Sequence, residues 1–205
     1  MSAQPPATVV GDVSGLPDTA MGPRSLVWWG TLGFMLIEGT AFLLAGAAYL
    51  YLRGQATTWP PSGHPPPDLT LGALFTVILL LSEIPNRWLA AKAKAQETRP
   101  VRLGIVVMSV LGIVLMAIRY LEFGRLNVNW DHDAYGSATW MLMILHATHV
   151  LTDLADTVVL GACIFTRKIT ASQFSDVNDN SFYWSFVVLT WLPIYALVYW
   201  GPRLL

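Results

Sequence analysis

The strongest constraint on the fold of this chain is a set of five apolar segments, each long enough to cross the roughly 30 Å of hydrocarbon in a bilayer. They cover residues 26–52, 69–90, 102–121, 135–165 and 182–200. Hydrocarbon accepts only helices or closed barrels, and none of the segments alternates as a strand would. The sequence therefore predicts an all-α integral membrane bundle of five transmembrane helices.

The composition agrees with a membrane protein. Charged residues make up 12% of the 205 residues and hydrophobic ones 54%, whereas soluble domains carry about a quarter charged residues. The net charge of −1 gives no sign of nucleic-acid binding. The single cysteine, Cys163, excludes an internal disulfide and a thiolate metal cluster.

The chain divides into a tail and one domain. Residues 1–23 are polar and rich in Pro and Gly, without the basic and apolar parts of a signal peptide, so we expect a disordered cytoplasmic tail before a five-helix domain at 24–205. The amino-terminal side of the bundle would hold eight Lys and Arg residues: Arg24, Arg87, Lys92, Lys94, Arg99, Arg102, Arg167 and Lys168. The opposite side would hold four: Arg53, Arg119, Arg125 and Arg203. Positive charge favours the cytoplasmic face, which predicts an amino terminus inside and a carboxyl terminus outside.

One apolar stretch, residues 135–157, carries an ionisable stripe. Its members are His146, His149, Asp153 and Asp156. At about 100° per residue of an α-helix, the four positions fall within a sector of about 80°. An apolar helix with such a stripe needs a partner for it, because unpaired ionisable groups in a membrane are costly.

The stripe has three interpretations. Metal ligation would use all four side chains, although ligand type alone selects poorly among metals. Haem ligation is weaker, because two histidines on one face of one helix cannot reach opposite sides of an iron. The favoured interpretation is a packed hydrogen-bond network with Glu38 or Glu122, in which the two aspartates pair with Thr152, Thr157 or a carboxyl group of another helix.

Glu38 lies near the middle of the first segment, where a charged carboxylate costs about 2.5–3.5 kcal/mol on insertion scales. We therefore expect it to be protonated or hydrogen-bonded to another helix. His149 and Asp153 lie at a similar depth by residue count, so the first and fourth helices could meet there. Two interpretations stay open: a proton-active or lipid-headgroup site, and a neutral structural hydrogen bond.

Other polar residues lie nearer the helix ends. Arg119 and Glu122 are three residues apart near the outer end of the third segment, which favours an intrahelical ion pair at a membrane interface over a substrate contact. Glu83 lies near the inner end of the second segment, and we expect it to reach toward polar headgroups. Pro193 predicts a kink in the fifth segment.

Five motifs follow one another in a fixed order. They are Glu38 with Phe42; Trp59-Pro60-Pro61 with Gly63; Glu122; Tyr135-Gly136-Ser137 followed by His146, His149 and Val150; and Tyr183-Trp184, Phe186-Val187, Trp191 and Tyr199-Trp200-Gly201 in the last segment. Through these motifs residues 25–202 resemble subunit III of the haem-copper oxidases, the cytochrome c oxidase subunit 3 family.

The resemblance implies a small helical subunit of the bacterial plasma membrane with no catalytic residue, cofactor or metal of its own. Such a subunit packs against the catalytic subunit I, in a complex with subunit II whose haem and copper lie in the partner subunits. It helps to keep proton uptake working and holds phospholipid in a cleft. The candidates for proton- or lipid-related roles are Glu38, Glu122, His146 and His149, and the candidate polar network is Asp153, Asp156 and Arg119.

The chain departs from the family pattern in two helices. Ser185 and Val188 stand where the closing helix of the family has His and Asp, and Asp153 and Asp156 stand where the family favours small residues. These departures leave the terminal enzyme open, because nitric oxide reductases have accessory subunits of the same family. A stand-alone transporter or metal-handling protein is a further alternative, although no inverted repeat supports a transporter.

Overall fold

The computed structural model describes residues 26–166 and 169–204, which form helices and loops without a strand. The long helices are α1 (Leu26–Gln55), α2 (Leu69–Lys94), α3 (Thr98–Phe123), α4 (Ala134–Thr166) and α5 (Ala171–Tyr195). A π-helical turn, η2 (Ala196–Trp200), and the short α6 (Gly201–Leu204) continue α5. Five helices are long and apolar enough to cross a membrane, which confirms the predicted all-α, five-span fold. The tail predicted at residues 1–23 lies outside the described residues.

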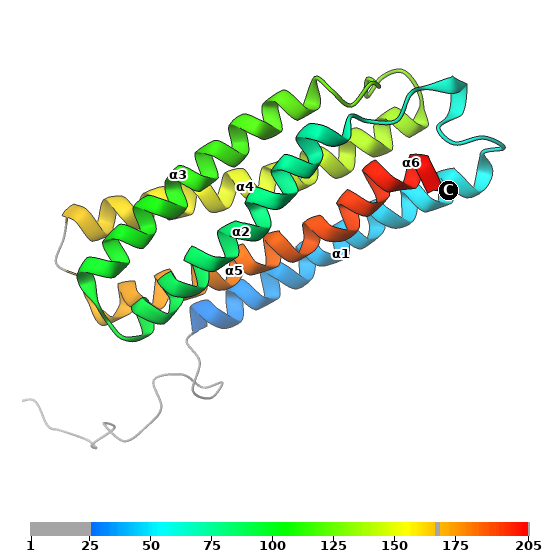
Figure 1. Ribbon diagram of the computed structural model, residues 1–205. Coiled ribbons are helices and arrows are strands. Elements are labelled where there is room, and N and C mark those ends of the chain that lie inside the picture. Colours follow the sequence, from blue (N-terminus) through cyan, green and yellow to red (C-terminus); the bar gives the residue numbers. More distant parts are fainter. Residues whose placement is uncertain (1–25, 167–168, 205) are drawn as a thin grey trace, which may run out of the picture.

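Four of the helices form a ring. α2 packs against α3, α3 against α4, α4 against α5 and α5 back against α2, while α1 lies against both α4 and α5. Figure 1 shows α1 running along the outside of the bundle beside α5. Only three residues of α1 are buried: Phe42, Ala45 and Tyr49. The helix therefore lies on the outside of the bundle, and it contacts the other helices through the one face that holds these three residues.

Helix boundaries differ most from the prediction at α5, which begins at Ala171 instead of residue 182. A capping box explains the earlier start, because the Thr170 and Gln173 side chains each bond the other residue's backbone amide. At α2, Asp68 caps the helix by accepting a 2.8 Å hydrogen bond from the Thr70 amide. That bond holds the pKa of Asp68 below its usual value, so the cap is charged at neutral pH.

Polar side chains join α2 to α5 inside the bundle. Trp184 Nε1 donates to Ser82 Oγ at 2.9 Å, and Trp191 Nε1 donates to Thr76 Oγ1 at 2.7 Å. Glu83 Oε1 accepts a 2.7 Å hydrogen bond from Ser185 Oγ. The Glu83 carboxylate is thus bound by the neighbouring helix, and it also pairs with Arg87 Nε at 2.9 Å.

The carboxyl end of α5 changes its helical period after Pro193, which lies inside the helix. The chain then passes through the π-helical turn before α6. Proline lacks the amide hydrogen that an α-helix needs, and a local π turn can satisfy the backbone groups that it frees in a transmembrane helix. This adjustment places Tyr199 in the interior, where it is fully buried.

Candidate functional site

Glu38 of α1 meets His149 of α4 and Tyr183 of α5. His149 Nε2 lies 3.0 Å from Glu38 Oε1, with 7% and 12% of the two side chains exposed. The Tyr183 hydroxyl lies 2.8 Å from Glu38 Oε2 and 3.0 Å from Oε1, and donates to the carboxyl group. Three helices therefore converge on one carboxyl group near the middle of α1.

The contacts of His149 determine how a proton is held there. Its Nδ1 lies against the carbonyl oxygen of Leu145, which can only accept, so Nδ1 carries a hydrogen. Nε2 has no aligned hydrogen bond but faces Glu38 at ion-pair distance. A proton shared by the two groups can lie on Glu38, leaving both groups neutral, or on Nε2, giving an ion pair. The net charge is zero in both arrangements, so a proton can move between them without moving net charge into the membrane.

His146, one turn away on α4, has a different environment. Arg119 Nη2 lies 3.2 Å from His146 Nδ1, and the Val187 carbonyl oxygen lies 3.1 Å from Nε2. A guanidinium can only donate and a carbonyl can only accept. His146 is therefore a neutral ring with both nitrogens engaged, which suits a structural bridge between α3, α4 and α5.

Arg119 and Glu122 form an ion pair within α3. Arg119 Nη1 lies 2.7 Å from Glu122 Oε2, and the Tyr199 hydroxyl donates to the other carboxylate oxygen. The guanidinium carbon also lies 3.7 Å from the centre of the Phe75 ring and 4.1 Å from that of Trp191. The predicted intrahelical pair is therefore present, and because both side chains are only 1% exposed, it lies inside the ring of helices.

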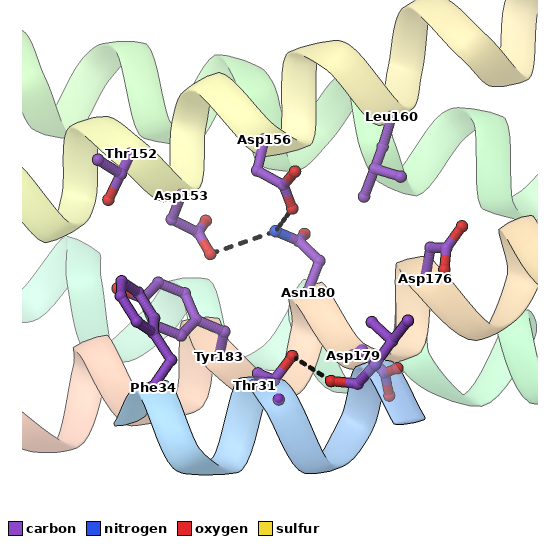
Figure 2. A pocket seen from close by; sticks show the side chains of 12 residues that line it. Thr31, Phe34, Thr152, Asp153, Asp156, Leu160, Asp176, Asp179, Asn180 and Tyr183 are labelled. Carbon is purple, nitrogen blue, oxygen red and sulfur yellow. Dashed lines mark hydrogen bonds between the residues drawn. The ribbon is translucent and has the colours of Figure 1, made fainter. Parts of the chain in front are cut away.

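The remaining stripe residues, Asp153 and Asp156, face α5. Asn180 Nδ2 donates to Asp153 Oδ1 at 3.3 Å and to Asp156 Oδ2 at 3.2 Å, and Asn180 Oδ1 accepts from Thr157 Oγ1 at 3.2 Å. Figure 2 shows the Asn180 amide between the two carboxylates. An amide of α5 therefore joins the two aspartates. Of the partners suggested from the sequence, Thr157 belongs to this group through its hydrogen bond to Asn180.

These aspartates line a cleft of about 710 Å³ between α1, α4 and α5. Its walls include four carboxylates: Asp153, Asp156, Asp176 and Asp179. Tyr183 also lines the cleft, while its hydroxyl bonds Glu38. Asp153 is 3% exposed and Asp156 is exposed at the surface. The cleft thus leads from the bundle surface to the side chain that contacts the Glu38–His149 pair.

The structure divides the stripe among three sets of partners: His146 joins Arg119 and Glu122, His149 joins Glu38, and the aspartates join Asn180. Within the described residues, no three ligand atoms of the stripe come together as a metal site would require. The sequence interpretation missed Asn180, which it placed before the last span. One feature of the sequence points to Asn180: it lies three residues before Tyr183, and residues three apart share one face of a helix.

A family model of cytochrome c oxidase subunit III matches residues 29–202. The chain belongs to the cytochrome c oxidase subunit III family. It is 25% identical to the cytochrome c oxidase subunit 3 of Synechocystis sp. over 183 residues, 87% of this chain and 77% of that protein. It is 25% identical to that of Thermostichus vulcanus over 83% of this chain and 85% of the relative. The Corynebacterium diphtheriae protein of the same name is 23% identical over 88% and 90%.

Two of the subunit III motifs quoted above, the W-P-P-x-G loop and Y-G-S, meet at one end of the bundle. Trp59 of the W-P-P-x-G loop donates from Nε1 to the Tyr49 hydroxyl at 3.1 Å, and its ring centre lies 4.9 Å from that of Tyr135. At Gly136, an added Cβ would come within 2.2 Å of the Asn129 carbonyl oxygen. This close approach explains why glycine follows Tyr135 in the Y-G-S motif.

Proposed function

We propose that this chain is the subunit III of a bacterial haem-copper oxidase, packed against subunit I in the plasma membrane, and that it supports proton uptake through Glu38. The observation that carries the proposal is the 3.0 Å contact of Glu38 with His149. Tyr183, which is hydrogen-bonded to Glu38, lines a cleft with four carboxyl groups. Two groups that can exchange a proton at constant net charge form a suitable proton store in a low-dielectric setting.

The charge of the cleft supports this function. No Lys or Arg is among the described residues that line it. A cleft whose ionisable groups are all acidic, with Asp156 exposed at its surface, raises the local concentration of counter-ions, here hydrated protons. Polar groups line the way from the surface to Glu38: exposed Asp156 comes first, then buried Asp153, then Tyr183. Figure 2 shows the two aspartates on one wall of the cleft.

The position of the cleft along the bundle also fits. It lies near the amino-terminal ends of α1 and α5, the side for which the Lys and Arg distribution predicts the cytoplasm. The span Ala171–Leu204 has 34 residues, about 51 Å of helix, against roughly 30 Å of hydrocarbon. This excess length allows the first turns of α5, with Asp176, to extend beyond the hydrocarbon into the headgroup region, where water would reach them.

A second, apolar groove would suit the acyl chain of a bound phospholipid. It has a volume of about 640 Å³ and lies mainly between α1 and α5. Gly39 and Gly46 of α1, Phe186 of α5 and Leu197 of η2 are among its lining residues. A lipid held there would cover part of the exposed apolar surface of α1 without a protein partner.

The functional test is made on the whole oxidase complex. In Glu38→Gln, the amide oxygen still accepts from Tyr183, but the side chain can no longer exchange a proton with His149. We expect the complex to assemble, to consume oxygen more slowly from the start because proton uptake is slower, and to lose activity sooner during continuous turnover. The matched control is Glu83→Gln, which removes a carboxyl group of α2 that does not line the cleft. This variant should keep its activity during continuous turnover for as long as the wild type does. Equal durability of the two variants would make Glu38 a structural residue.

A further inference from the structure

Three metal-binding side chains come together outside the helices, where the loop between α1 and α2 meets the loop between α3 and α4. His64 Nε2 lies 3.3 Å from His132 Nδ1 and 3.3 Å from Asp133 Oδ2. His132 Nδ1 lies 3.8 Å from the same carboxylate oxygen. Among the described residues, this is the group in which three ligand atoms lie within 4.8 Å of one another.

The spacing of these atoms is that of a tetrahedral metal site. Zinc binds His nitrogen and carboxylate oxygen at about 2.0–2.2 Å, so the ligand atoms of a tetrahedral site are about 3.3–3.6 Å apart. Two of the three separations match this length, and the third, at 3.8 Å, exceeds it slightly. Hydrogen bonding alone does not account for the group, because Asp133 Oδ2 is buried and makes no aligned hydrogen bond.

Contacts that do not involve the ligand atoms hold the two loops in place. Asp133 Oδ1 accepts from the Gly136 amide at 2.7 Å, which leaves Oδ2 to face the histidines. Between the loops, the Asp68 amide donates to the Arg125 carbonyl at 3.1 Å, and Asn127 Nδ2 donates to the Pro66 carbonyl at 2.9 Å. The ligands are therefore positioned by the fold before any ion binds, which is what a specific site requires.

We propose that His64, His132 and Asp133 bind a divalent transition-metal ion of the Zn²⁺ type, with water as the fourth ligand. Two imidazoles and one carboxylate suit Zn²⁺, Cu²⁺ or Co²⁺ and do not suit Mg²⁺ or Ca²⁺, which prefer oxygen ligands. The His132 side chain is 57% exposed, so the site is open to water and to ions from solution.

The bound ion would fasten the loop between α1 and α2 to the loop between α3 and α4. Trp59 and Tyr135 already pack between these segments, with ring centres 4.9 Å apart. A metal bridge beside them would reinforce the same end of the bundle. Bound Zn²⁺ should therefore raise the thermal stability of the subunit, since an ion that binds only the folded state stabilises it.

The test uses the purified, complete oxidase complex, treated with chelator and then titrated with Zn²⁺ against a chromophoric competitor. The decisive variant is Asp133→Asn, which keeps an oxygen for the Gly136 amide but removes the carboxylate ligand. His64→Gln and His132→Gln remove the other two ligands. We expect the wild-type complex to bind one more Zn²⁺ than each variant, or to bind that ion at least about tenfold more tightly, because even the loss of an outer hydrogen-bond partner of a metal ligand weakens binding by about 10–100-fold.

Asp131→Asn is the matched control, because it removes an exposed carboxylate of the same loop without changing a ligand, and it should bind as the wild type does. Co²⁺ supplies a second measurement: difference spectra between the Co²⁺-loaded and metal-free complex, in which the haem bands cancel, should show the visible absorption of tetrahedral Co²⁺ for the wild type and Asp131→Asn and not for Asp133→Asn. Equal Zn²⁺ binding by the wild type and all three ligand variants, or an absorption spectrum unchanged by Asp133→Asn, would overturn the proposal.

Discussion

Two histidines three residues apart on one helix have different chemistry because of the atoms that face them. His146 lies between a donor, Arg119, and an acceptor, the Val187 carbonyl, so its tautomer is determined and it has no site for another proton. His149 faces Glu38, which can itself hold or release a proton. Residue type and spacing alone could not have separated the two roles.

The buried ion pair of α3 gives a prediction at the residue scale. Replacing Arg119 with Met fills similar volume against Phe75 and Trp191 but leaves Glu122 charged without its partner at 1% exposure. Removing one member of a buried pair costs about 3–5 kcal/mol. We expect Arg119→Met to lower the thermal denaturation temperature of the detergent-solubilised complex strongly.

The double variant Arg119→Met/Glu122→Gln provides the control. It removes both charges while Gln can still accept from Tyr199, so it should recover most of the lost stability. If the single and double variants denatured at the same temperature, the charge of Glu122 would not be the cause of the loss.

Polar contacts inside the membrane were partly predictable from residue identity. That Glu38 and the α4 stripe need partners follows from the cost of ionisable groups in hydrocarbon. The particular partners do not follow, because the depth and rotation of one helix against another depend on the packing of all of them. Asn180 lies on a helix opposite the stripe only because α5 begins eleven residues earlier than its apolar run indicates.

At the scale of elements, hydropathy was sufficient for the number and order of the spans and insufficient for their ends. Hydropathy does not predict the first turns of α5, because these turns are not uniformly apolar. Phe174 and Val177 face the core, whereas the cleft is faced by Asp176, Asp179 and Asn180. The meeting of His64 with His132 and Asp133 was equally invisible, because it depends on the approach of two loops from different parts of the chain.

Close helix contacts at glycine give a prediction at the element scale. A Cβ at Gly72 of α2 would lie 2.4 Å from the Tyr199 ring, which is held by its hydrogen bond to Glu122. Overpacking of this kind costs about 1–3 kcal/mol. Gly72→Ala should therefore lower the denaturation temperature of the complex.

Gly33→Ala on α1 is the matched substitution, since nothing lies within 4 Å of its added Cβ. Alanine is favoured over glycine in a helix by about 1 kcal/mol, so this variant should be as stable as the wild type or more so. Equal destabilisation by the two variants would show that backbone effects, and not the contact with Tyr199, are responsible.

At the scale of the whole molecule, the ring of α2, α3, α4 and α5 forms the core and α1 covers one side of it (Figure 1). The two openings described above both lie along α1, the acidic cleft toward its amino-terminal end and the apolar groove further along. The least buried helix thus carries both the central carboxyl group and the walls of the two cavities.

Membrane orientation gives the prediction at this scale. In a Cys163→Ser background, a cysteine replacing exposed Asp131 should react with a membrane-impermeant maleimide in intact spheroplasts. A cysteine replacing exposed Lys94 should react only after detergent is added. The opposite labelling pattern would place the acidic cleft on the outer side and remove it from the path of proton uptake.

The role of Glu38 is tested most directly by the rate of proton uptake during a single turnover of the whole complex, followed with a pH-indicator dye. We predict that Glu38→Gln slows this uptake several-fold relative to the wild type, because the pair with His149 no longer holds an exchangeable proton, while Glu83→Gln leaves it unchanged. Proton uptake at the wild-type rate in Glu38→Gln would contradict the account.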